Sequence, residues 1–266
     1  MKNLVLTVVF CFCLFAPQTT WAWGRLGHAV VANIAEANLT PKARERVMYY
    51  MHGQPLRDVS SFVDEVAGIE PYKTAFLGWH ASMANPECKS PLYVRYQGRN
   101  LRDGVTAMYF LRELLKDYKA LDDSTVLCGI KCMVHLVGDF HCPEHVRFTD
   151  DLNDGKFAIT FFGKPTTYHK IWDTALIVKG HPGWTVEQWT KHLNTWKKKQ
   201  IKAVTKGWAQ EWFEDGAKDV RPLVGKVREG AQIEMNFVQE HLPLAELELT
   251  KAGYQLAAAL NEIFGK

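Results

Sequence analysis

Two histidine–aspartate pairs have a spacing that suits metal binding. His135 and Asp139 are four residues apart, and His169 and Asp173 repeat that interval. On an α-helix, residues four apart lie on one face, so each pair can direct an imidazole nitrogen and a carboxylate oxygen at one point. Both groups are common zinc ligands. The spacing therefore indicates divalent-metal chemistry.

A further histidine strengthens this interpretation. His145 follows the first pair, beyond Pro143, which we expect to bend the helix. Histidine and aspartate on otherwise apolar helices need partners, because burying them unpaired is costly. The alternative is a set of satisfied core histidines and surface ion pairs. Four other histidines are predicted to be surface or helix-capping residues, namely His52, His181, His192 and His241.

Helices should carry both pairs. Ser124–Phe140 holds the first pair and is apolar on nearly all sides, which predicts a buried central helix. Thr167–Val178 holds the second pair and is also predicted to be helical. Apolar periodicity predicts further helices, namely His28–Leu39, Lys42–Met51, Val59–Ala67, Arg102–Tyr118, Ala217–Glu240 and Leu244–Phe264, the last two separated by a break at Leu242-Pro243.

The remaining segments are less regular. Pro71–Asn100 is predicted to be irregular, with a short strand near Leu92–Tyr96. Lys156–Phe162 alternates in polarity, and a turn at Asn153-Asp154-Gly155 would make it part of a small hairpin. These features predict a single all-α domain with a small β-hairpin over residues 23–266.

Composition limits the function classes. The chain has 266 residues, of which 47% are hydrophobic and 23% charged, and its formal net charge is +3. This is an ordinary globular composition, and the charge is too small for a polybasic nucleic-acid binder. An anionic substrate would have to be held locally, and metal ions are one means of doing so.

The first 22 residues have the features of a secretory signal peptide. Lys2 precedes the apolar run Leu4–Ala16, and Thr20-Trp21-Ala22 offers small residues at a cleavage site. The run is too short for a membrane anchor. We therefore expect a secreted or periplasmic protein whose processed chain begins at Trp23.

Four cysteines follow the predicted signal peptide. An exported chain with an even number of cysteines permits disulfide bonds, and four cysteines allow three pairings. Buried free thiols are the alternative. The absence of a C-x-x-C pair argues against a cysteine-ligated zinc finger. The four residues are Cys88, Cys128, Cys132 and Cys142.

Several motifs occur in a fixed order along the whole chain after Ala22. They are Trp23-Gly-Arg-Leu-Gly-His28, Phe62-Val-Asp64-Glu, His80, His135-Leu-Val-Gly-Asp139 with Pro143 and His145, and His169-Lys-Ile-Trp-Asp173. The ordered set resembles the zinc-dependent single-strand nucleases of fungi, plants and bacteria, also called class I nucleases. Bacterial phospholipase C is a more distant relative of that family. The resemblance implies the mainly helical fold of this superfamily.

The resemblance also implies a set of metal ligands for three zinc ions. One zinc would be bound by Asp64, His80, His135 and Asp139, and a second by His145, His169 and Asp173. The third would take His28, Asp139 and the α-amino nitrogen and carbonyl oxygen of Trp23. Asp139 would therefore bridge two metals, and removal of the signal peptide would complete the third site.

The implied activity is hydrolysis of single-stranded DNA or RNA to 5′-mononucleotides, with 3′-nucleotidase activity. A zinc-bridged hydroxide would attack phosphorus, with Asp64 and Asp139 as the catalytic carboxylates. No protein nucleophile is needed. We expect a monomer that acts on single-stranded nucleic acid or nucleotides as substrates, with no stable nucleic-acid partner and no membrane partner.

This chain departs from the family pattern on the substrate side. Ala67 stands where an arginine near the phosphate is common, Ala81 stands where the fungal enzymes have a base-stacking aromatic residue, and an acidic residue that reads the base falls near Met83. Cys142 lies beside the ligands, and no metal role is predicted for it. A phospholipase C-like esterase and a non-catalytic zinc-binding protein are the competing interpretations. The short interval from Trp23 to His28 favours the nuclease.

Overall fold

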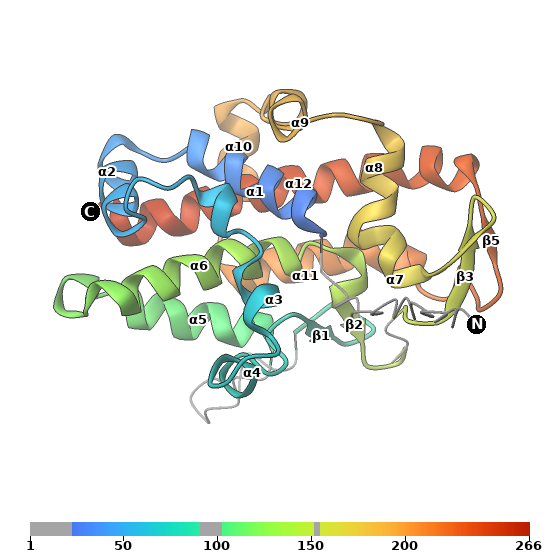
Figure 1. Cartoon of the computed structure of the whole chain (residues 1–266), viewed down its shortest axis with the longest axis horizontal. Coiled ribbons are helices and arrows are strands. Elements are labelled where there is room, and N and C mark those ends of the chain that lie inside the picture. The colour runs from blue at the N-terminus through green and yellow to red at the C-terminus, as the bar shows by residue number, and fades with distance from the viewer. Residues whose placement is uncertain (1–22, 91–102, 152–154) are drawn as a thin grey trace, which may run out of the picture.

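The computed structural model describes residues 23–90, 103–151 and 155–266. Helices dominate this part of the chain (Figure 1), as the sequence predicts. The longer helices in chain order are α1 (Arg25–Ala37), α2 (Pro41–Tyr50), α5 (Gly104–Leu115), α6 (Asp123–Asp139), α9 (Val186–Leu193), α10 (Lys198–Val204), α11 (Ala209–Val220) and α12 (Met235–Phe264). Shorter helical segments are η1 (Leu56–Val59), α3 (Phe62–Val66), α4 (Tyr72–Ala75), α7 (Tyr168–Lys170), η5 (Ile171–Ala175) and α8 (Leu176–Gly180).

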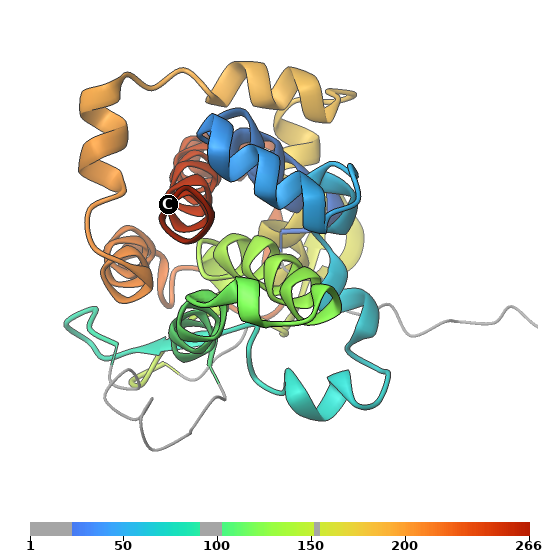
Figure 2. The same cartoon turned by 90° about the vertical axis from the view of Figure 1, so that its left-hand side faces the viewer.

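The core lies between α1, α6 and α12. Figure 2 looks along α12 and shows α1, α6 and α11 arranged around it. Their facing side chains are fully buried, for example Ile34, Val134 and Leu256. Each such aliphatic side chain contributes about 1.5–3 kcal/mol by leaving water. The prediction of a buried central helix is confirmed, since α6 buries His135 and Asp139 together with its apolar residues.

Short polar side chains fix where two helices begin. Thr40 caps α2 by accepting a hydrogen bond from the amide of Ala43, and Pro41 occupies the first helical position. Asp122 caps α6 in the same manner through the amide of Thr125, at 2.8 Å. At its other end α6 stops at Asp139, and Pro143 opens a separate short turn, η4 (Pro143–His145). The predicted bend is therefore a helix end.

Two short parallel strands bring two histidine-bearing segments together. β1 (Ser82–Ala84) pairs with β2 (Val146–Phe148), with Ser82 opposite Val146. Because β1 begins two residues after His80 and β2 begins directly after His145, this pairing places the two histidines side by side.

The predicted hairpin exists, but its turn is at the other end of the segment. β3 (Ala158–Phe161) pairs antiparallel with β4 (Lys164–Thr167) and parallel with β5 (Gln232–Ile233). The connection is Phe162-Gly163, with φ of 49° and 72°. Positive φ at both central residues is the geometry that matches strand twist in a two-residue hairpin. The predicted turn residues Asn153 and Asp154 lie outside the described residues.

The prediction for residues 217–266 was wrong at two points. Ala217–Glu240 is not one helix, because α11 ends at Val220 and the chain passes through β5 before α12. After α11 the chain tightens into the short 3-10 helix η6 (Arg221–Leu223), where Pro222 provides no backbone N–H to continue the α-helical hydrogen bonds. Conversely, α12 runs through Pro243 without a break. The proline costs about 3 kcal/mol, and buried residues on both sides of it, such as Val238 and Leu249, offset that cost.

Other predictions have simpler outcomes. The predicted helix Val59–Ala67 is divided into η1 and α3, and α4 lies within the segment expected to be irregular. The predicted strand Leu92–Tyr96 and the predicted signal peptide lie outside the described residues. All four described cysteines are free thiols, so the disulfide bonds that their number permits do not form among them. Within the described ranges, every helix is too short or too polar to cross a bilayer.

Candidate metal centre

Six chain segments deliver histidine and aspartate side chains to one buried region. The amino end of α1 lies beside the carboxyl end of α6 and the segment α7–η5 (Figure 1). α3 and the ends of β1 and η4 complete the surroundings. The side chains delivered there are His28, Asp64, His80, His135, Asp139, His145, His169 and Asp173.

The first cluster joins four of these side chains within ligand distance. His80 Nδ1 lies 3.0 Å from Asp139 Oδ2, 3.6 Å from Asp64 Oδ1 and 3.3 Å from His135 Nε2. His135 Nε2 lies 3.2 Å from Asp139 Oδ2 and 3.8 Å from Asp64 Oδ1. Four ligands at zinc–ligand distances of about 2.0–2.1 Å in a tetrahedron are about 3.3 Å apart. The cluster therefore has the dimensions of a zinc site.

The second cluster uses the other oxygen of the same carboxylate. Asp139 Oδ1 lies 3.3 Å from His28 Nε2, and both side chains are almost fully buried. The His28 ring stacks on His135 with centroids 4.3 Å apart. Asp139 thus faces His135 with one oxygen and His28 with the other, which is the arrangement a bridging carboxylate needs.

Trp23 lies at the start of α1, next to this second cluster. Its side chain is fully buried, its carbonyl oxygen accepts the amide of His28 at 3.3 Å, and the Gly24 amide donates to the carbonyl of Asp173. These contacts fix the backbone of Trp23 between α1 and η5.

The third cluster lies around Asp173. His145 Nε2 and His169 Nε2 are 3.2 Å apart, and Asp173 presents Oδ1 to His145 at 3.9 Å and Oδ2 to His169 at 3.5 Å. Asp173 sits in the π-helical turn η5, so the helix that was predicted over this pair is irregular at the aspartate. Such turns occur frequently at functional sites.

Neighbouring groups orient the imidazoles. The carbonyl of Ser60 accepts from His135 Nδ1 at 2.9 Å, and the carbonyl of His80 accepts from His145 Nδ1. Because Nδ1 is engaged in each bond, the Nε2 atom of each ring is the one directed at the cluster. Metal-binding histidines usually donate their other nitrogen in this manner. Glu144 Oε2 lies 3.9 Å from His169 Nδ1. The sequence did not reveal these contacts, because they depend on tertiary structure.

A glycine makes room for the second cluster. A Cβ atom on Gly138 would lie 2.6 Å from His28 Nδ1. Any other residue at position 138 would push His28 away from Asp139, so the glycine within His135–Asp139 contributes to the geometry.

Burial sets the protonation of the cluster without a metal. Burial lowers the pKa of His28 to about 4 and that of His145 to about 3. Burial would also lower the pKa of His135, but the carboxylates of Asp139 and Asp64 raise it to about 9. Burial raises the pKa of Asp64 to about 6. Unlike neighbouring His28, His135 is therefore protonated at neutral pH until a cation replaces its proton.

Several buried nitrogen and oxygen atoms of these side chains have no hydrogen bond within the described part of the chain. They are His28 Nδ1 and Nε2, Asp64 Oδ2, Asp139 Oδ1 and Asp173 Oδ2. Leaving a buried polar group unsatisfied costs about 1–3 kcal/mol, and more when the group is charged. A bound cation satisfies such atoms, so the donor set and its orphaned atoms fit divalent metal ions.

Cys142 belongs to the surroundings of the third cluster. Its Sγ lies 3.6 Å from Asp173 Oδ1, and the residue is fully buried. Burial raises the pKa of this thiol well above its usual range. It is therefore a neutral thiol that donates a weak hydrogen bond to Asp173.

The three positions at which the sequence departs from the family pattern lie close in the chain to the clustered side chains. Ala67 follows α3, which carries Asp64, and Ala81 directly follows His80. Met83 is half-buried in β1, opposite Arg147 of β2. The structure places small or apolar side chains at all three positions.

Comparison with known proteins identifies the family. The S1/P1 nuclease family model matches residues 23–265. Endonuclease 2 of Arabidopsis thaliana is 23% identical over 99% of this chain and 98% of its own length. Nuclease P1 of Penicillium citrinum is 23% identical over 91% of this chain and 98% of its own, and nuclease S1 of Aspergillus oryzae is 25% identical over 94% of each. The chain belongs to the S1/P1 nuclease family of hydrolytic nucleases.

Proposed function

We propose that residues 23–266 form a zinc-dependent phosphodiesterase that hydrolyses single-stranded DNA or RNA to 5′-mononucleotides, with 3′-nucleotidase activity. Residues 1–22 would direct its export as a signal peptide. The observation that carries this proposal is the ring of buried histidine and aspartate side chains around Asp139, whose orphaned oxygen and nitrogen atoms require a cation.

Three zinc ions account for the ligand atoms. The first zinc would be held in the first cluster by Asp64, His80, His135 and Asp139. The second zinc would be held in the third cluster by His145, His169 and Asp173. The third zinc would be held in the second cluster by His28, the other oxygen of Asp139, and the amine and carbonyl of Trp23. The proposal is supported by ligand-atom distances of 3.0–3.8 Å in the first cluster. Processing at Ala22 would supply the free amine of Trp23.

Zinc would supply Lewis-acid activation of water and neutralisation of phosphate charge. The protein contributes orientation and charge. The Ser60 carbonyl accepts from His135 Nδ1 and so orients the ring with Nε2, the atom from which zinc would displace a proton, toward the cluster. Asp64 and Asp139 present oxygens to the same point. Three aspartates do not cancel the charge of three divalent ions, so the loaded site would attract an anionic substrate in a chain whose net charge is only +3.

Single-stranded substrates are favoured over phospholipids by the family match along nearly the whole chain. Ala81 and Met83 leave the surroundings of the phosphate without the usual base-reading side chains. The preference among bases and sugars should therefore be weak. A non-catalytic zinc-binding role is disfavoured because the metal ligand set is complete.

The test is to incubate the zinc-loaded chain that begins at Trp23 with a single-stranded oligonucleotide and to identify the products. Release of 5′-mononucleotides that stops on addition of a chelator is the expected result. A chain that binds zinc but releases no nucleotides would contradict the nuclease proposal. Phosphatidylcholine in mixed micelles serves as the parallel substrate for the phospholipase alternative.

A further inference from the structure

A second group of metal-ligating side chains lies outside the centre around Asp139. His181, at the end of α8, and His192, in α9, both direct Nε2 at Oε1 of Glu246 in α12, at 2.8 Å and 3.2 Å respectively. The three ligand atoms lie within 4.8 Å of one another. The sequence predicted only surface or capping histidines at positions 181 and 192, because α8, α9 and α12 are brought together by the fold.

We propose that His181, His192 and Glu246 form an additional zinc site, which we call the peripheral site. Two imidazoles and a carboxylate suit zinc, whereas magnesium and calcium prefer oxygen ligands. The observed separations of 2.8 Å and 3.2 Å approach the value of about 3.3 Å between ligands of a tetrahedral zinc ion. To reach that spacing, the shorter separation must widen by about 0.5 Å.

Tryptophan side chains hold the two imidazoles in place. The His181 ring stacks on Trp184 with centroids 3.7 Å apart and meets the buried Trp189 edge-on at 4.8 Å. His192 also packs edge-on against Trp184, at 5.2 Å. Because these contacts restrict both rings, little side-chain entropy remains to be lost when a metal binds.

The peripheral site is open to solvent. The side chains of His181, His192 and Glu246 are 24%, 43% and 21% exposed. A metal held by these three ligands can therefore complete a four-coordinate shell with water, and it can enter from solution without unfolding of the protein.

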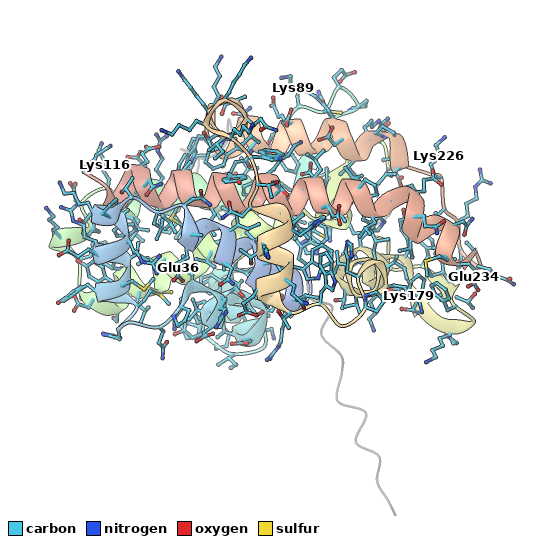
Figure 3. All side chains as sticks on the ribbon, turned by 90° about the horizontal axis from the view of Figure 1, so that it is seen from above. Glu36, Lys89, Lys116, Lys179, Lys226 and Glu234 are labelled. Carbon is cyan, nitrogen blue, oxygen red and sulfur yellow. The ribbon has the colours of Figure 1, made fainter. Side chains whose placement is uncertain are left out.

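The location indicates a structural role. α9 lies over α1 and reaches α12, while α8, marked by Lys179, packs against α12 (Figure 3). α8 continues the helix that contains His169 and Asp173, and His181 is eight residues beyond Asp173, about 12 Å along a helix. A zinc ion at the peripheral site would link the end of this helix at His181 to α9 and α12.

The experiment compares the zinc content of the full processed chain with that of its variants after equilibration at one buffered free zinc concentration. Wild type should bind one more zinc per chain than His192→Ala or Glu246→Gln. His52→Asn, which alters an exposed histidine outside the cluster, is the matched control and should keep the wild-type content. Outer-shell partners of metal ligands are worth 10–100-fold in affinity, so loss of a ligand should weaken this zinc by about 100-fold or more.

The activity of the variants separates this inference from the proposed function. His192→Ala should lose the zinc of the peripheral site but hydrolyse oligonucleotides at a rate within about twofold of wild type. Equal zinc content in wild type and both variants, with native circular dichroism spectra, would overturn the peripheral site. Because the comparison is a difference between chains, it holds whatever number of metals binds around Asp139 and whatever the substrate is.

Discussion

The centre around Asp139 and the peripheral site contain the same residue types in different surroundings. At the centre, His28 and His135 are fully buried and Asp139 is 1% exposed, and its Oδ1 has no hydrogen bond to any described residue. At the peripheral site the side chains are 21–43% exposed, and Glu246 accepts from both histidines.

The difference shows what burial implies about a metal. Buried and orphaned ligand atoms are costly unless a cation satisfies them, so the centre is expected to bind metal as part of the folded enzyme. Exposed ligands that are satisfied by one another and by water can remain without a metal. Changes at the centre should therefore abolish activity, and changes at the peripheral site should affect only zinc content and stability.

Replacing the shared carboxylate should have the largest effect. Asp139→Asn removes the negative charge that faces both His135 and His28. We expect oligonucleotide hydrolysis to fall by about 10³-fold or more, since removing even one transition-state stabilising group can cost 10²–10³-fold. Asp123→Asn, at the exposed start of the same helix, is the control and should stay near wild type. Comparable activity in the two variants would contradict the assignment of Asp139.

Blocking the amine of Trp23 should have the next largest effect. A chain that keeps even one residue before Trp23 has an amide in place of the amine, and the third zinc would lose a ligand. We expect kcat/KM to decrease by about 100-fold. The measurement compares chains whose first residue has been established by mass spectrometry. An N-terminally extended chain as active as the processed one would remove Trp23 from the ligand set.

Zinc binding at the centre should depend on pH. The pKa of His135 is raised to about 9 in the metal-free protein, above the ordinary value of about 6.5. Its charged pair with Asp139 therefore stabilises the metal-free fold fully below pH 6.5, and this stabilisation disappears as pH rises through 9. Zinc must displace that proton, so its affinity should rise about tenfold per unit from pH 7 to 9. Titration against a competing chelator measures this, and an affinity independent of pH would refute it.

Restoring a base-stacking side chain should have a moderate effect. Ala81→Phe adds an aromatic ring directly after His80, and base stacking on an aromatic side chain is worth about 1–3 kcal/mol. We expect KM for a single-stranded oligonucleotide to fall by about fivefold or more, with little change in kcat. Leu77→Phe, on an exposed position before the site, should leave KM unchanged. If KM does not decrease in Ala81→Phe, the base must bind away from position 81.

The smallest effect should come from the peripheral site. A zinc ion at 100 times its dissociation constant stabilises the fold by about 2.7 kcal/mol, which corresponds to roughly 5–10 °C in Tm for a chain of this size. Zinc added at low free concentration should therefore raise the Tm of wild type more than that of His192→Ala, as measured by scanning calorimetry. An identical zinc-dependent increase in both would argue against a structural role.

The sequence was most informative where potential metal-binding residues also follow the helical period. The buried helix α6 and both histidine–aspartate pairs followed from local pattern, and the other proposed ligands came from the family resemblance. Tertiary contacts decided the rest. The sequence did not predict that Ser60 orients His135, or that α12 passes through Pro243, because both depend on packing between distant segments. The hairpin turn was also missed, because its first central residue, Phe162, has a positive φ, which is uncommon for residues other than glycine.

The peripheral site shows the same limit for function. His181, His192 and Glu246 share no local motif, and the last two are 54 residues apart. Local pattern reveals ligands that lie on one helix, whereas a site assembled from three helices becomes visible only in the fold.

The most direct test of the central claim is a count of zinc in Asp139→Asn, made in the His192→Ala background so that the peripheral site does not contribute. If Asp139 bridges two metals, both should bind about 100-fold more weakly without it. At a buffered free zinc concentration that just fills the unsubstituted centre, the count should therefore fall from three per chain to one, with the remaining zinc at His145, His169 and Asp173. A count that falls by one or not at all, in a chain with a native circular dichroism spectrum, would contradict the bridging carboxylate and the trinuclear centre built on it.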